Sequence, residues 1–256
     1  MLVDLKVFYL GHLKNLYTIQ YNTIQYNTTS RRQHQSIVGI PITPARSVRN
    51  LGIYIDADLS TRAHVNRTVS RCFDALRRLR QIRRAVPTAT FQILVLVLVH
   101  SLLDYGNAVL VCIPAYLVRR LQSVVNAAAR LIYHLRPHDH ITDALATIHW
   151  LRVPERVQYK IAVLTYKVLH DNAPRYLGPL VAVADLPGRR ALRSASTSRL
   201  ITAHQIVYCW QPCLSVATAQ VWNSLPEVVI LSSSLQSFWR QLKTHLFQLS
   251  YPHLIL

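Results

Sequence analysis

The sequence predicts a mainly helical fold, a bundle-like region of helices preceded by a small β-hairpin. Half of the 256 residues are apolar (51%), which is enough to form a buried core. Only six residues are glycine, and this scarcity disfavours a turn-rich β-sandwich. Apolar residues also recur at steps of three and four along most of the chain, which is the period of an amphipathic helix.

The N-terminal quarter of the chain has a different character. Residues 1–35 contain the tandem pentapeptide run TIQYNTIQYNTT at 18–29, which is too short for a repeat fold, and we expect an irregular segment. Residues 36–60 contain two short β-rich runs, Ile37–Ile40 and Leu51–Ile55. With prolines between them, these runs predict a two-stranded hairpin with a long connection.

The strongest helical pattern covers residues 61–86, with Ser60 as the expected N-cap and Pro87 as the stop. Its apolar stripe is predicted to consist of Val65, Val69, Cys72, Leu76, Leu79, Ile82 and Val86. The remaining faces carry eight arginines: Arg62, Arg67, Arg71, Arg77, Arg78, Arg80, Arg83 and Arg84. Asp74 is the one acidic residue in this helix, which therefore has a net charge of +7.

The next segment is strongly apolar, with ILVLVLV at 93–99 and AVLVCI at 108–113. Asp104 and Asn107 interrupt it, and an aspartate near a bilayer centre costs about 2.5–3.5 kcal/mol. We therefore expect a buried helix over 89–104, a turn at Asp-Tyr-Gly-Asn, and another helix. The alternative is a small single-pass membrane protein built on residues 91–113.

Further helices are predicted over residues 115–133, 141–148, 155–170 and 235–249. Their expected N-terminal residues are Pro114, Asp139, Pro154 and Ser233 or Ser234. Phe238, Leu242, Leu246 and Leu249 should face inward in the last helix. The predicted organisation is a helical region over 61–183, a basic linker and irregular stretch over 184–214, and a C-terminal helical segment over 215–256.

The charge of the chain predicts a polyanionic partner. The net charge is +18, and 24 of the 29 cationic residues are arginine, which pairs bidentately with phosphate. Like charges repel at helical spacings of three and four, and a polyanion would relieve that repulsion. The eight arginines of helix 61–86 are therefore the predicted nucleic-acid contacts. An ordinary solvated helix face is the other interpretation.

No catalytic residue and no metal ligand is predicted. Asp56 and Asp58 form a close acidic pair, but neither a third carboxylate nor a glycine-rich phosphate loop accompanies them. Histidines cluster around Asp139, but Pro137 breaks the helix that would align them. We expect these acids to serve a turn and a helix N-terminus, and the histidines to lie at helix ends.

Seven short segments resemble, in order and spacing, the C-terminal part of reverse transcriptases from non-LTR (LINE-type) retrotransposons. They are SVRNLGIYIDADLS (47–60), HVNRTVSRCF (64–73), LLDYGNAVL (102–110), LVRRLQSVVNAAARLIYHLRPHDHIT (117–142), IHWLRVPERVQYKIAVLTYKVLHDNAPRYL (148–177), VWNSLP (221–226) and FWRQLKTHLF (238–247). The resemblance covers roughly 200 residues and implies that residues 36–60 are the end of a palm-like region, followed by a helical thumb-like region over 61–183 and a connecting region. Residues 1–30 and 203–214 depart from the family pattern, as in a decayed copy.

In that family, catalysis uses Mg²⁺ and an aromatic-x-Asp-Asp motif in the palm, and this sequence contains no Asp-Asp pair. The resemblance therefore implies a catalytically incomplete fragment of an RNA-directed DNA polymerase that at most binds template–primer, without a cofactor of its own. A translated pseudogene without a selected function is a further alternative. The N-terminus lacks a signal-peptide pattern, so the expected location is intracellular, in the nucleus or cytoplasm.

Overall fold

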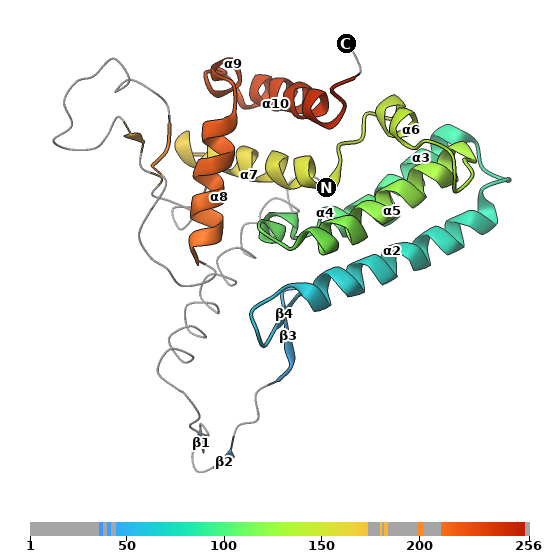
Figure 1. Cartoon of the computed structure of the whole chain (residues 1–256), viewed down its shortest axis with the longest axis horizontal. Coiled ribbons are helices and arrows are strands. Elements are labelled where there is room, and N and C mark those ends of the chain that lie inside the picture. The colour runs from blue at the N-terminus through green and yellow to red at the C-terminus, as the bar shows by residue number, and fades with distance from the viewer. Residues whose placement is uncertain are drawn as a thin grey trace.

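The computed structural model describes residues 36–37, 40–41, 45–173, 180, 182–183, 199–201 and 211–253 (Figure 1). Within these ranges the protein is mainly helical, and an antiparallel hairpin precedes the first described helix, as predicted. The predicted irregular segment over 1–35 and most of the predicted linker and irregular stretch over 184–214 lie outside the described residues.

The hairpin has different strands from those predicted. β3 (Ser47–Asn50) pairs with β4 (Ile53–Asp56), whereas β1 (Ser36–Ile37) pairs with β2 (Ile40–Pro41). The expected pairing of the run at 37–40 with the run at 51–55 is therefore wrong. Leu51 and Gly52 form a two-residue turn with φ of 45° and 88°. Positive φ at both positions matches the twist of a tight hairpin. The turn was not predicted because leucine is an unusual residue at the first of these positions.

α2 (Arg62–Ile82) follows the hairpin and buries Val65, Val69, Cys72, Leu76 and Leu79, as the periodicity predicted. The helix ends earlier than expected, and Ile82, predicted to face inward, is 42% exposed.

Ser60 is not the N-cap of α2. Thr61 occupies that position, and the orphan N–H of Ala63 donates instead to Asp56 Oδ2 at 2.9 Å. The same oxygen accepts a hydrogen bond from Ser60 Oγ at 3.1 Å. Asp56 thus satisfies the N-terminus of α2 from the end of β4, as expected for an acid beside a helix dipole.

The apolar segment that follows is divided into short pieces. α3 (Thr88–Val95), the π-helix η1 (Leu96–His100) and α4 (Ser101–Asp104) run on from one another, and η2 (Asn107–Leu110) follows the predicted turn. The helix is not wholly buried as predicted, because Ile93, Leu96, Val97 and Leu98 are exposed. Among the described residues, no helix combines the length and apolarity that a membrane crossing requires.

Two glycines bring this turn against the hairpin. Gly106 has a φ of 68°, and a Cβ there would lie 2.7 Å from Ile53 Cδ1. A Cβ on Gly52 would lie 2.8 Å from Tyr105 Oη. Both contacts therefore require the absence of a side chain, and they hold β3–β4 beside α4.

The central helices have boundaries close to those predicted. α5 (Ala115–Tyr133) follows Pro114, α6 (Thr142–Thr147) is short, and α7 (Val153–Leu169) has a proline in its first turn. Asp139 does not cap α6 as expected, because its Oδ2 accepts the backbone N–H of Arg136 at 2.6 Å. At the N-terminus of α7, the side-chain oxygen of Gln122 from α5 accepts the backbone N–H of Val153 at 2.9 Å.

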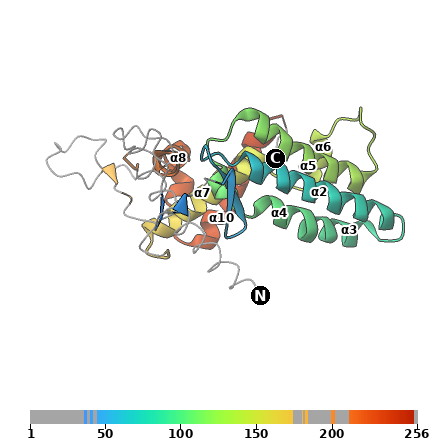
Figure 2. The same ribbon diagram turned by 90° about the horizontal axis from the view of Figure 1, so that it is seen from below.

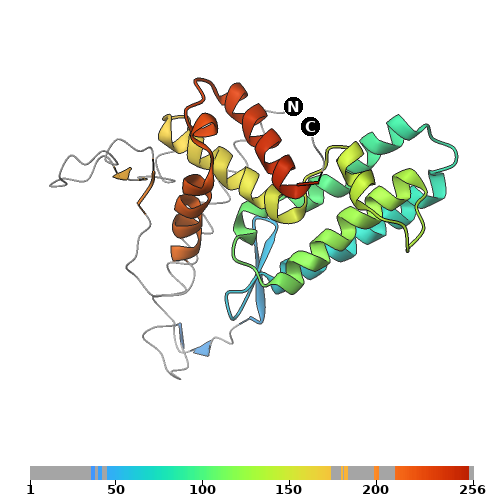
Figure 3. The same cartoon turned by 45° about the horizontal axis from the view of Figure 1, so that its top comes forward.

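The C-terminal segment contains α8 (Gln211–Ser224), α9 (Glu227–Ile230) and α10 (Leu235–Ser250). Ser234 caps α10, as expected of one of the two serines, by accepting the N–H of Ser237 at 3.2 Å. Phe238, Leu242 and Leu246 are buried, whereas Leu249, predicted to face inward, is 55% exposed. Figure 3 shows α7 (yellow) beside α10 (red), on the opposite side of the molecule from most of α2.

One hydrophobic core connects the α2–α5 side of the molecule with the α7–α10 side. Buried residues of α2, α5, α7 and α10 belong to a single contiguous cluster. Within it, His100 is 4% exposed, and its ring centroid lies 4.0 Å from that of Trp150. Its Nε2 meets no hydrogen-bond partner among the described residues. Burial, together with the nearby charge of Arg156, lowers the pKa of His100 to about 3.

This histidine predicts sensitivity to acid. Between its ordinary pKa of 6.5 and about 3, the unfolded state binds more protons than the folded state. The free energy of unfolding should therefore fall as pH decreases through this window, by roughly 1 kcal/mol per pH unit for His100. Urea unfolding at a series of pH values measures the slope. His100→Gln should reduce it without abolishing it, because burial also lowers the pKa of His64, to about 4. An unchanged slope in the variant would contradict the argument.

Candidate nucleic-acid interface

The eight arginines predicted to contact nucleic acid lie in different environments in the structure. Arg77 and Arg80 lie one turn apart on the flank of α2 that faces α5, and Arg84, directly after α2, lines the same groove. Arg67 and Arg71 line a different groove, beside the hairpin. The remaining three are Arg62 and Arg78, which are exposed and line neither groove, and Arg83, which is buried.

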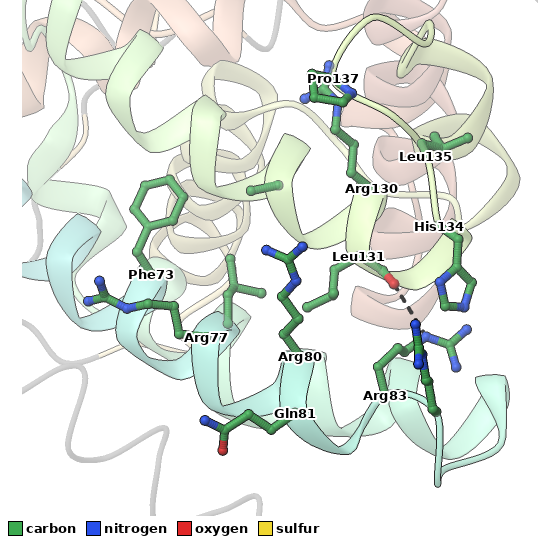
Figure 4. A pocket seen from close by; sticks show the side chains of 13 residues that line it. Phe73, Arg77, Arg80, Gln81, Arg83, Arg130, Leu131, His134, Leu135 and Pro137 are labelled. Carbon is green, nitrogen blue, oxygen red and sulfur yellow. Dashed lines mark hydrogen bonds between the residues drawn. The ribbon is translucent and has the colours of Figure 1, made fainter.

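The flank facing α5 forms a basic groove of about 770 Å³, which we call the interhelical groove. Its basic side chains are Arg77 and Arg80 of α2, Arg83 and Arg84 directly after α2, Arg130 of α5, and His134 directly after α5. Figure 4 shows Arg80 extending from α2 toward α5, which carries Arg130. No acidic side chain is among the residues that line it.

Two further features describe the charge in this groove. The Nε of Arg130 is buried and finds no hydrogen-bond partner in the described part of the chain. Arg77 forms an ion pair with Asp74 one helical turn earlier, but both side chains are more than half exposed. Water screens an exposed pair of this kind, so it neutralises little of the groove. Arg130 and His134 were not predicted from the sequence, because only the packing of α5 against α2 brings them here.

Arg83 corrects the prediction that all eight arginines reach nucleic acid. It is 8% exposed, and its guanidinium donates to the carbonyl oxygens of Ile132 at 2.8 Å and Leu131 at 3.3 Å (Figure 4). It also donates to Thr88 Oγ1 at 3.1 Å, and its Cζ lies 4.8 Å from the ring centroid of Phe91. Arg83 is thus a structural residue that binds the C-terminal carbonyls of α5, which lack partners within their own helix.

A sequence signal for the burial of Arg83 exists. Position 83 continues the spacing of the apolar stripe four residues after Leu79, and Ile82 is three residues after it. Both positions fit an amphipathic pattern. The sequence pattern favoured Ile82 as the buried residue because its side chain is apolar. In the structure, the unpaired carbonyls of α5 favour a long cation, Arg83, at the inward position.

The acidic pair adjoining α2 is engaged in local hydrogen bonds. Asp56 binds the helix N-terminus, and Asp58 Oδ1 accepts the N–H of Ser60 at 3.0 Å. Hydrogen bonds from Ser60 lower the pKa of Asp58. In the described residues, no three His, Cys, Asp or Glu side chains gather closely enough to hold a metal ion. His149, of the predicted histidine group, stacks on Phe247 with ring centroids 5.5 Å apart.

Comparisons of this chain with protein-family models, with curated proteins and with solved structures give no match.

The structural role of Arg83 predicts a contrast between two neighbouring arginines. Arg83→Met keeps the length of the side chain but leaves buried carbonyls unpaired, so the free energy of unfolding should fall by about 2–3 kcal/mol. Arg84→Gln, at an exposed position, should change it by less than about 0.5 kcal/mol. Urea denaturation followed by circular dichroism measures both. Equal effects of the two substitutions would show that Arg83 makes no special contribution.

Proposed function

We propose that this chain binds the phosphate backbone of nucleic acid through the interhelical groove and the exposed arginines of α2. The observation that carries the proposal is that six basic side chains, from α2, α5 and the residues directly after these helices, line one groove and no acidic residue lines it. The proposal agrees with the resemblance to the region behind the palm of LINE-type reverse transcriptases, in which such a fragment would hold template–primer.

The electrostatics of the groove favour a polyanion. Arg77, Arg80 and Arg84 line the same groove, where like charges repel, and Arg130 adds a further cation opposite them. Packing of the core holds these groups together, and the one carboxylate paired with them, Asp74, is in an exposed pair that water screens. A phosphate backbone would relieve the repulsion and pair bidentately with guanidinium groups.

The arrangement favours binding that is independent of nucleotide sequence. The apolar walls of the groove, such as Leu76 and Leu131, belong to the packed surfaces of α2 and α5, and its exposed donors are mainly guanidinium groups. Contacts of this kind position a backbone, whereas sequence is discriminated at base edges. We therefore assign the groove to phosphates.

Salt dependence tests this assignment. Phosphate contacts release counterions, so the logarithm of the affinity for a duplex should fall linearly with the logarithm of salt concentration. The combined substitution of Arg77, Arg80 and Arg84 by Gln should flatten that slope by about 3 and weaken all duplex sequences alike. Fluorescence anisotropy with two unrelated duplexes measures both effects.

The matched control replaces three exposed cations that line neither groove, Arg119, Arg120 and Arg240, by Gln. It removes the same net charge from other surfaces and should leave most of the slope intact. If both triple variants lose affinity equally, binding reflects net charge alone. A wild-type affinity no greater than that of a charge-matched unrelated protein would instead favour a translated pseudogene.

We further propose that the chain does not polymerise nucleotides. Asp56 and Asp58 are both occupied in local hydrogen bonds, and the sequence contains no Asp-Asp pair. Primer extension on an RNA template, with Mg²⁺ or Mn²⁺, should give no incorporation above a protein-free blank. Incorporation that disappears in the Asp56→Ala, Asp58→Ala double variant would contradict this prediction and identify the pair as catalytic.

A further inference from the structure

A second basic groove lies where the hairpin meets α2, and we call it the hairpin groove. It has a volume of about 850 Å³ and is bounded by β3–β4, the N-terminal half of α2 and α4. Its cationic side chains are Arg49 of β3 and Arg67 and Arg71 of α2, and no acidic residue lines it. Ser70 and Ser101 add hydroxyl groups.

This groove is distinct from the interhelical groove. The residues that line the two grooves do not overlap, and the grooves occupy different halves of α2. Figure 2 shows α2 between α5 on one side and α3 and α4 on the other. The interhelical groove faces α5, whereas the hairpin groove lies on the side of α4 and the hairpin. Arg67 and Arg80 are thirteen residues apart, which is about 20 Å along a helix axis.

An aromatic ring from the hairpin organises the arginines of the hairpin groove. The Cζ of Arg67 lies 4.3 Å from the ring centroid of Tyr54, and the Cζ of Arg49 lies 5.8 Å from the same centroid. Strand alternation explains the position of this ring, because Ile53 and Ile55 on either side of Tyr54 point into the core. Arg49 is the cross-strand partner of Tyr54.

The contacts with Tyr54 reduce the entropic cost of binding an anion. A free arginine side chain loses rotamer freedom when it binds an anion, and this loss opposes binding. Contact with one ring restricts two guanidinium groups in advance, while their N–H donors stay available at the edges. Tyr54 is therefore a positioning residue for a pair of cations from a strand and a helix.

We infer that the hairpin groove is a second phosphate-binding site, in which Arg49, Arg67 and Arg71 bind backbone phosphates and Tyr54 positions two of them. The inference rests on the proposed function, since the ligand is the same nucleic acid. It adds a site on a separate flank of α2, so the full interaction requires a ligand long enough to reach from one groove to the other. A mononucleotide is too short for this.

Binding of a twenty-base-pair duplex at several salt concentrations tests the inference. The Arg49→Gln, Arg67→Gln double variant should flatten the salt slope by about 2, and Arg71→Gln alone by about 1. The double variant removes both arginines that contact Tyr54 and could disturb the hairpin. Arg71→Gln tests the groove without removing either of these arginines. Arg119→Gln, Arg120→Gln is the control of equal charge, at exposed positions outside both grooves.

Two substitutions of Tyr54 test its positioning role at constant net charge. Tyr54→Phe keeps the aromatic face and should bind within about twofold of the wild type, whereas Tyr54→Leu should bind about 3- to 10-fold more weakly. The salt slope of Tyr54→Leu should stay near that of the wild type, because all arginines remain. Circular dichroism measures whether each variant is folded.

The outcomes separate this inference from the proposed function. If the hairpin-groove variants bind like their control while the interhelical triple variant loses affinity and slope, the second site is wrong and the proposed function stands. If wild-type binding does not exceed that of a charge-matched protein, both are wrong. Equal binding by Tyr54→Leu and Tyr54→Phe would remove the positioning role alone.

Discussion

The guanidinium group of Arg83 joins three helices, and the geometry of the interhelical groove depends on that contact. It extends from the end of α2, binds the last carbonyls of α5 and lies over Phe91 of α3. A buried cation is costly without compensation. Here the negative end of the α5 dipole and an aromatic face provide that compensation. The contact fixes α2 against α5, so Arg77, Arg80 and Arg84 line the same groove as Arg130.

The use of the acidic residues explains why the exposed arginines remain uncompensated. Asp104 binds Arg156 with two hydrogen bonds, at 3.0 Å and 2.5 Å, and so connects α4 to α7. Asp56 binds the N-terminus of α2, and Asp139 orders the loop after α5. These three carboxylates stabilise the fold locally, and none of them lines either groove. Residues 61–86 alone carry seven of the 18 excess positive charges.

The attachment of the hairpin to α4 positions two side chains of the hairpin groove. Gly52 and Gly106 permit contacts that a Cβ would block, and Tyr105 of the intervening turn donates a hydrogen bond to the carbonyl oxygen of Leu51. These contacts place Arg49 and Tyr54 beside the N-terminal half of α2. The exposed apolar side chains of α3 and η1 lie on another part of the surface, and they line neither groove.

The sequence by itself determined the helical class, the extents of α5 and α7, the buried stripe of α2 and the concentration of arginine on that helix. These properties are local, because a period of three and four residues and a proline in the first turn act within one segment. Tertiary structure alone decided the strand partner of β4, the outward position of Leu249 and the different roles of Arg83 and Arg84. It also brought Arg130, His134, Arg49 and Tyr54 beside α2. The physical reason is that an arginine is buried or exposed according to the acceptors it meets, and those of Arg83 lie 48 and 49 residues away in the chain.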